Sequence, residues 1–137
     1  MTYGELKDHV MHQTNNDSED LGDFLPYLDR YLFEGYDRLL FAWANIHVGD
    51  DVMYPAMKND ADVPLLPEWT HNAIADWATW LVYRNGNPQK QSRGMQYRYA
   101  FEEVLARVRA SGGAYAAEFG GANGENSIQN FKNHLLP

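Results

Sequence analysis

The sequence contains no cysteine, which excludes disulfides and thiolate metal sites from this chain. Basic residues are also scarce, because 11 Lys and Arg stand against 19 Asp and Glu, for a formal net charge of -8. A surface of this sign does not attract phosphate backbones or anionic membranes. No apolar run approaches the roughly 20 residues of a membrane span, and the opening residues lack the basic start of a signal peptide. We therefore expect synthesis in the cytosol, protein partners and no membrane contact.

Catalytic signatures are missing as well. There is no Gly-x-Ser-x-Gly, no phosphate loop and no dinucleotide fingerprint. His9 and His12 lie three residues apart, but no third ligand follows at metal-site spacing. Asp60 and Asp62 lack the glycine and glutamate of a calcium loop, so we interpret them as turn residues. We expect no enzymatic activity, no metal and no cofactor.

What the chain does contain is enough apolar surface for one core, with 45% hydrophobic and 14% aromatic residues among 137. Apolar residues recur every three to four positions over residues 2–13, 26–44, 67–84 and 88–111. Thr2 and Glu5 have capping-box spacing, Asn87 can cap the last helix, and Gly35 weakens the second. The predicted fold class is all-α, a small four-helix domain over residues 1–111.

Two segments fall outside this helical pattern. The long loop at residues 45–67, between the second and third helices, is a candidate contact surface because ordered domains seldom keep such loops unused. Residues 112–137 follow a Gly-Gly stop and are predicted to form an extended C-terminal arm. Its separated apolar anchors are Tyr115, Phe119, Ile128, Phe131, Leu135 and Leu136.

A basic segment, residues 84–99, stands out in the otherwise acidic chain. It carries Arg84, Lys90, Arg93 and Arg98 among tyrosines, which suits either nucleic acid or an acidic protein surface. We favour protein contact because the net charge opposes binding to DNA. On the preceding helix Trp77 and Trp80 point about 300° apart, so we expect Trp80 to be exposed to a partner.

Residues 54–111 together resemble a known family. The loop ending in "DVPLLPEW", the helix "HNAIADWATWLVYRNGNP" and the helix ending in "AFEEVLARVRA" resemble the head-tail connector, or adaptor, proteins of tailed bacteriophages and prophages. The opening "TYGELKDHV" resembles this family more weakly, and residues 112–137 lie outside the resemblance.

The resemblance implies a structural protein of the virion, at the head-tail junction, made in the host cytoplasm. Such proteins assemble as a ring of neighbouring copies, commonly a dodecamer, beneath the portal protein, and they join it to a tail-side stopper or tail protein. DNA passes through the channel only in transit, and an acidic lumen would let it slide. The alternative from a different class is a small prophage-encoded helical protein that binds or regulates another protein as a monomer or dimer.

Overall fold

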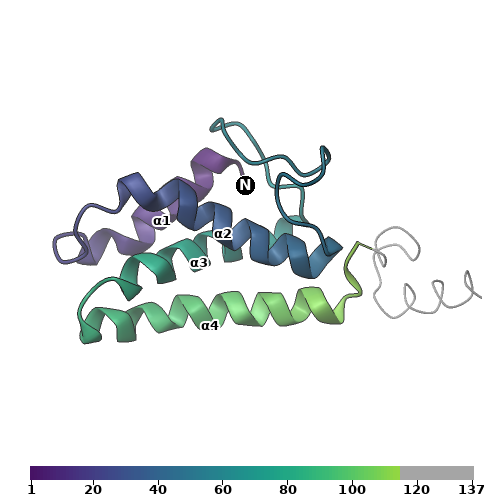
Figure 1. Cartoon of the computed structure of the whole chain (residues 1–137). Helices are drawn as coiled ribbons and strands as arrows, with labels where there is room; N and C mark the ends of the chain where they lie inside the picture. The colour runs from purple at the N-terminus through teal and green to yellow at the C-terminus, as the bar shows by residue number, and fades with distance from the viewer. Residues whose placement is uncertain (115–137) are drawn as a thin grey trace, which may run out of the picture.

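The computed structural model describes residues 1–114, and within this range the chain is helical and contains no strand. Its elements are α1 (Tyr3–Thr14), η1 (Asn15–Asp17), α2 (Leu25–Ala44), η2 (Glu68–Thr70), α3 (His71–Arg84) and α4 (Pro88–Ala110), where η marks a 3-10 turn. The all-α prediction is confirmed, with a long connection between α2 and α3. Figure 1 shows this connection arching over one end of the helices.

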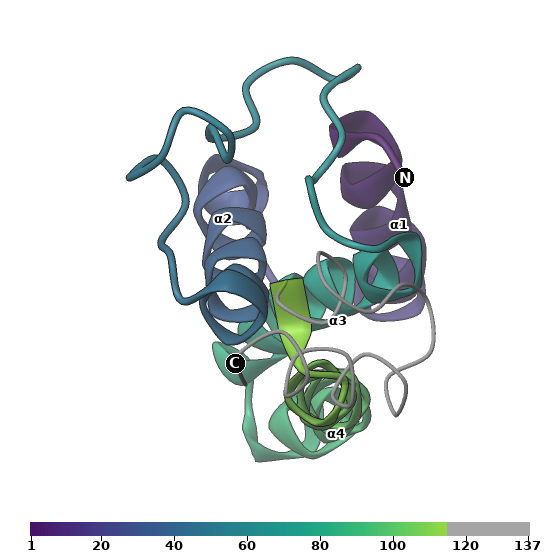
Figure 2. The same ribbon diagram turned by 90° about the vertical axis from the view of Figure 1, so that its right-hand side faces the viewer.

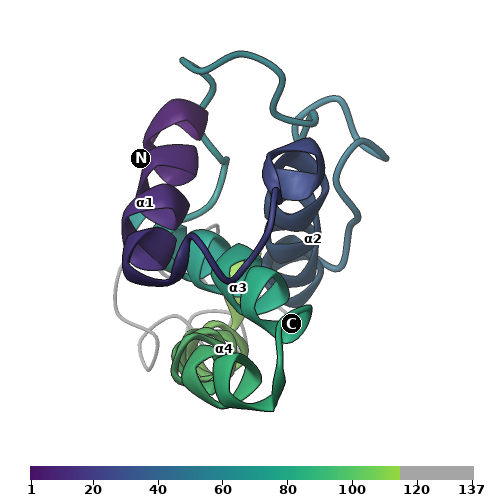
Figure 3. The same cartoon turned by 90° about the vertical axis from the view of Figure 1, so that its left-hand side faces the viewer.

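The third helix is the centre of the fold. Helices α1 and α2 lie on one side of α3 and α4 lies on the other, as the two end-on views show (Figures 2 and 3). From Ala73 to Tyr83 every residue of α3 is buried except Asp76. A helix that is apolar all round must be enclosed to be stable, and three neighbouring helices provide that enclosure.

Two glycines let the neighbouring helices approach α3 closely. A Cβ at Gly35 would lie 3.0 Å from the Ile74 carbonyl oxygen, and one at Gly94 would lie 2.4 Å from the Tyr83 Cβ. Gly94 therefore needs the absence of a side chain for the packing of α4 on α3, and at Gly35 a side chain would fit only if α3 shifted slightly away from α2. Gly35, expected to be a weak point in its helix, is thus a contact point between helices.

The helix ends follow the local sequence with one exception. The capping box of Thr2 and Glu5 is present, and the Asn87 side chain accepts a hydrogen bond from the Lys90 N–H. The third helix, expected to begin at Pro67, instead begins at His71. Pro67 has extended backbone angles, and residues Glu68–Thr70 form a 3-10 turn before α3. The proline ends the loop, and one further turn precedes the α-helix.

Candidate functional site

The loop at residues 45–67 is the strongest candidate for a contact surface. It leaves α2 at Asn45, whose left-handed backbone (φ 56°) ends the helix. The Asp37 carboxylate then holds the first turn, because it accepts a hydrogen bond from the Val48 N–H at 2.8 Å and lies 2.9 Å from the His47 Nδ1. The His47 ring stacks on Phe41 with centroids 4.9 Å apart. The start of the loop is therefore fixed to the outer face of α2.

The middle of the loop is closed by Asp62. Its carboxylate accepts hydrogen bonds from the N–H groups of Lys58 and Asn59, each at 2.8 Å. These two donors, with that of Asn59 the larger influence, hold the pKa of Asp62 below its ordinary value. The prediction of turn chemistry at Asp62 is confirmed, because its carboxylate holds the backbone of the loop.

The first turn of α1 ties this closed loop to the helices. The Tyr3 N–H donates to the Asp62 carbonyl at 2.7 Å, and the Gly4 N–H donates to the Asp60 carbonyl at 3.0 Å. The Lys7 ammonium adds an ion pair with the Asp60 carboxylate at 2.7 Å. The first N–H groups of a helix have no partner within the helix, so the loop carbonyls satisfy donors that would otherwise need water.

The last part of the loop is held from beneath. The Leu65 N–H donates to the Tyr36 hydroxyl at 3.2 Å, and the buried His71 ring donates from Nε2 to the Leu66 carbonyl at 2.9 Å. Burial lowers the pKa of His71, so its imidazole stays neutral at pH 7. The loop is thus anchored at its start to α2, in its middle to α1, and at its end to α2 and α3.

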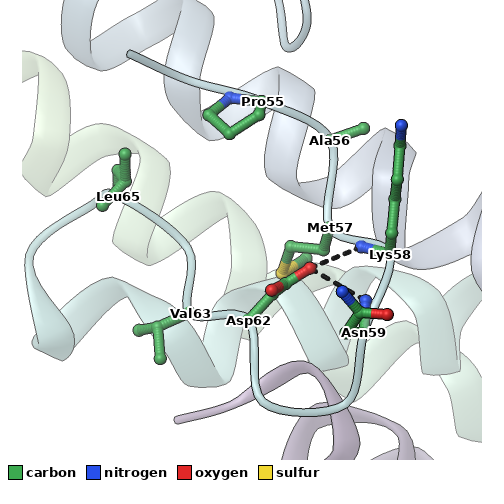
Figure 4. A pocket seen from close by; sticks show the side chains of 8 residues that line it. All are labelled: Pro55, Ala56, Met57, Lys58, Asn59, Asp62, Val63 and Leu65. Carbon is green, nitrogen blue, oxygen red and sulfur yellow. Dashed lines mark hydrogen bonds between the residues drawn. The ribbon is translucent and has the colours of Figure 1, made fainter. Parts of the chain in front are cut away.

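The anchored loop encloses an open pocket of about 380 Å³ (Figure 4). The pocket is lined by Pro55, Ala56, Met57, Lys58, Asn59, Asp62, Val63 and Leu65. Val63 is 49% exposed and Leu65 is 53% exposed, and at the nearby tip Val52 is 95% exposed. Four apolar side chains of this loop, those of Val52, Met53, Val63 and Leu65, face solvent. Mostly apolar walls suit the binding of an apolar group.

The expected exposure of Trp80 is wrong. Trp80 is only 7% exposed, because its ring lies against Gly94 and the Arg98 guanidinium covers it at 5.6 Å. Trp69 is 42% exposed instead, under the Arg107 guanidinium at 4.8 Å. The argument from helical phase failed because α3 is enclosed on all sides, so that opposite faces are both buried.

Lys90 also differs from its predicted role as a free surface charge. Its ammonium is buried and lies 2.5 Å from the carboxylate of the buried Asp17 and 3.2 Å from that of Asp20. The Arg93 guanidinium and the Tyr83 hydroxyl also donate to Asp17. The hydrogen bond from Lys90 is the main cause of the lowered pKa of Asp17. This cluster joins the connection after α1 to α3 and α4, so Lys90 stabilises the monomer.

The other basic residues do not form one free cationic surface. Arg98 pairs with Glu102 on its own helix, with a distance of 3.0 Å, and Arg93 is held by Asp17 although half of its side chain is exposed. Arg84 is exposed at the end of α3. Of the predicted contact residues, Arg84, Arg93 and Arg98 are therefore accessible to a partner, whereas Trp80 and Lys90 are buried.

Of the two histidines of α1, His9 belongs to a polar network between helices. The His9 Nε2 lies 3.2 Å from the Gln13 amide nitrogen, which donates to Asp76 at 2.9 Å, while the Thr79 hydroxyl donates to the Gln13 amide oxygen. Burial raises the pKa of Asp76. Over residues 1–114, no group of three or more Asp, Glu or His side chains is placed to hold a metal ion.

The arm anchors Tyr115, Phe119, Ile128, Phe131, Leu135 and Leu136 lie outside the described residues. Among the helices of the described part, none is both long and apolar enough to cross a bilayer. Comparison of the chain with protein-family models, curated proteins and solved structures gave no match.

Proposed function

We propose that this chain is a structural subunit of a phage head-tail connector. In this role it assembles as a ring beneath the portal protein, joins it to a tail-side protein and forms part of the channel through which DNA leaves the head. The observation that carries the proposal is the surface of the loop at residues 45–67, where apolar side chains are held outward on an anchored backbone. The resemblance of residues 54–111 to connector proteins points to the same assembly.

The anchoring of the loop is what makes it suitable for assembly. A flexible loop must be ordered on binding, which costs roughly 1–2 kcal/mol for each residue whose backbone is fixed. Here hydrogen bonds from α1, α2 and Asp62 have already ordered the backbone that carries Val63 and Leu65. Most of the free energy of burying these side chains is then available for association.

Charge and the arm fit the same proposal. A net charge of -8 suits a channel subunit, because a negative wall does not bind DNA tightly as it passes. The arm, residues 112–137, carries separated apolar anchors that would bind the portal. Arg84, Arg93 and Arg98 would pair with acidic side chains of the portal or of a neighbouring copy.

The mass of the assembled protein tests this proposal. Native mass spectrometry across concentration, with and without the portal protein from the same genome, should show a ring of many copies. Leu65→Asp should weaken that assembly by about 2 kcal/mol or more, as expected for a contact at the centre of an interface. The matched control is Leu25→Asp, which changes a leucine that is 57% exposed at the start of α2, outside both the loop and the basic segment, and should leave assembly unchanged.

The alternative is a regulatory protein that uses the same loop to bind one partner. It is supported by the same exposed apolar surface but predicts a monomer or dimer at every concentration, whether or not the portal is present. That result would overturn the connector proposal and leave the loop as the binding site of a different protein.

A further inference from the structure

The end of the described chain lies beside the start of the loop. Gly113 has a left-handed backbone (φ +63°), and a Cβ at this position would lie 2.3 Å from the Trp43 carbonyl oxygen. Only glycine fits there. Trp43 is in the last turn of α2, two residues before the loop begins at Asn45. The described chain therefore ends next to the base of the loop.

The loop and the distal part of the arm are complementary in composition. The loop presents apolar side chains around its pocket, and its residues 45–67 carry four aspartates and one lysine. Residues 128–136, "IQNFKNHLL", carry Lys132 and no acid. Their apolar residues, Ile128, Phe131, Leu135 and Leu136, have the i, i+3, i+7, i+8 spacing by which amphipathic segments fill apolar grooves.

The segment that joins the end of the described chain to residues 128–136 is long enough for these residues to reach the loop of the same molecule. The 14 residues from Tyr115 to Ile128 reach roughly 45 Å when extended. A tethered segment of this length acts at an effective concentration in the millimolar range, which favours its own molecule over another copy in dilute solution.

We propose that residues 128–136 dock on the pocket lined by residues 55–65 of the same molecule. In the isolated subunit this contact covers the apolar surface of the loop, and a binding partner of the loop must displace it. The docking needs neither the portal nor a ring, so it can occur even if the proposed function is wrong. The mass measurement tests the function, and a separate experiment tests the docking. The arm then covers the loop before assembly and becomes free for other contacts when the loop is bound.

The absence of cysteine permits a direct test in the full-length chain. Asn59→Cys places a thiol on the pocket rim, and Asn133→Cys places one in the arm without removing an apolar residue. The control pair, Gln89→Cys with Asn133→Cys, has its first thiol on the exposed start of α4, across α3 from the loop (Figure 2). At low protein concentration, mild oxidation should cross-link the pocket pair within one molecule about tenfold faster than the control pair.

Equal rates for the two pairs, or mainly disulfide-linked dimers from the pocket pair, would overturn the proposal. A second measurement needs no introduced cysteine. Amide hydrogen exchange of residues 52–65 should become faster in the double variant Phe131→Ser and Leu136→Ser, and should not change in Tyr115→Ser and Phe119→Ser. Unchanged exchange in the first variant would show that these two anchors do not cover the loop.

Discussion

The helical core and the loop at residues 45–67 use polar side chains in opposite ways. In the core, polar groups are buried or half-buried and bind other side chains, as Asp17 binds Lys90 and Gln13 binds Asp76. In the loop, the backbone is held by carboxylates, that of Asp37 on α2 and that of Asp62 in the loop itself, while the apolar Val63 and Leu65 stay exposed. The core is thus built for stability of the single chain, whereas the loop keeps apolar surface available for contact.

The largest expected difference between the two regions is the cost of removing a leucine. Leu81 is fully buried in α3, so Leu81→Ala should lower the free energy of unfolding by about 3 kcal/mol. Leu65 is half exposed in the loop, so Leu65→Ala should change the free energy of unfolding by less than about 0.5 kcal/mol. Urea denaturation of both variants measures the two values. Equal losses would mean that Leu65 belongs to the core.

A smaller effect is expected from adding one methyl group at Gly94. The new Cβ would lie 2.4 Å from the Cβ of Tyr83. Because a Cβ is bonded directly to the backbone, this overlap can be relieved only if α3 and α4 move apart. Gly94→Ala should therefore destabilise the protein by about 1–3 kcal/mol, despite the higher helix propensity of alanine. Ser92→Ala, on the exposed side of α4, is the control, because it makes a substitution to alanine in the same helix without touching α3. A Gly94→Ala variant more stable than wild type would contradict the close packing of α3 and α4.

The loop should open locally when Asp62 is replaced. Asp62→Ala removes the acceptor of the Lys58 and Asn59 N–H groups, so their hydrogen exchange should become about tenfold faster while the helices keep their protection. Because the pKa of Asp62 is lowered in the folded state, its contribution is present above its ordinary pKa of 3.8 and is lost as the pH falls through the lower folded value. Unchanged exchange in the variant at pH 7 would refute the role of Asp62.

The smallest effect concerns His71 beneath the end of the loop. Its folded pKa is lowered by burial, so the unfolded chain binds the proton first, and stability falls as the pH drops below the ordinary value of 6.5. His71→Gln should make the decrease in melting temperature between pH 7 and pH 5 smaller. An identical pH dependence in wild type and variant would show that His71 does not contribute to it.

Sequence reasoning succeeded where a local signal is sufficient. The capping box at Thr2, the Asn87 cap and the recurring apolar residues predicted the four helices, and the stretch without helical spacing predicted the long connection between α2 and α3. It failed where the outcome depends on distant parts of the chain. Lys90 pairs with Asp17, 73 positions away, which no local pattern indicates. The burial of Trp80 had one available signal, because "AIADWATWLVY" is almost wholly apolar and predicts an enclosed helix.

The Asp17 cluster has a consequence for the order in which the chain folds. Helices α3 and α4 are joined by three residues and can pair through local contacts, whereas the bonds of Asp17 to Tyr83, Lys90 and Arg93 span 66 to 76 positions. Local contacts form with a smaller loss of chain entropy, so we expect the α3–α4 hairpin to form early and the Asp17 contacts to close after the rate-limiting barrier. Asp17→Asn should then mainly accelerate unfolding in stopped-flow experiments, and an equally slowed refolding rate would place the closure before the barrier. A chain that folds in this order would present its α3–α4 hairpin first and the loop at residues 45–67, which α1 must hold, last.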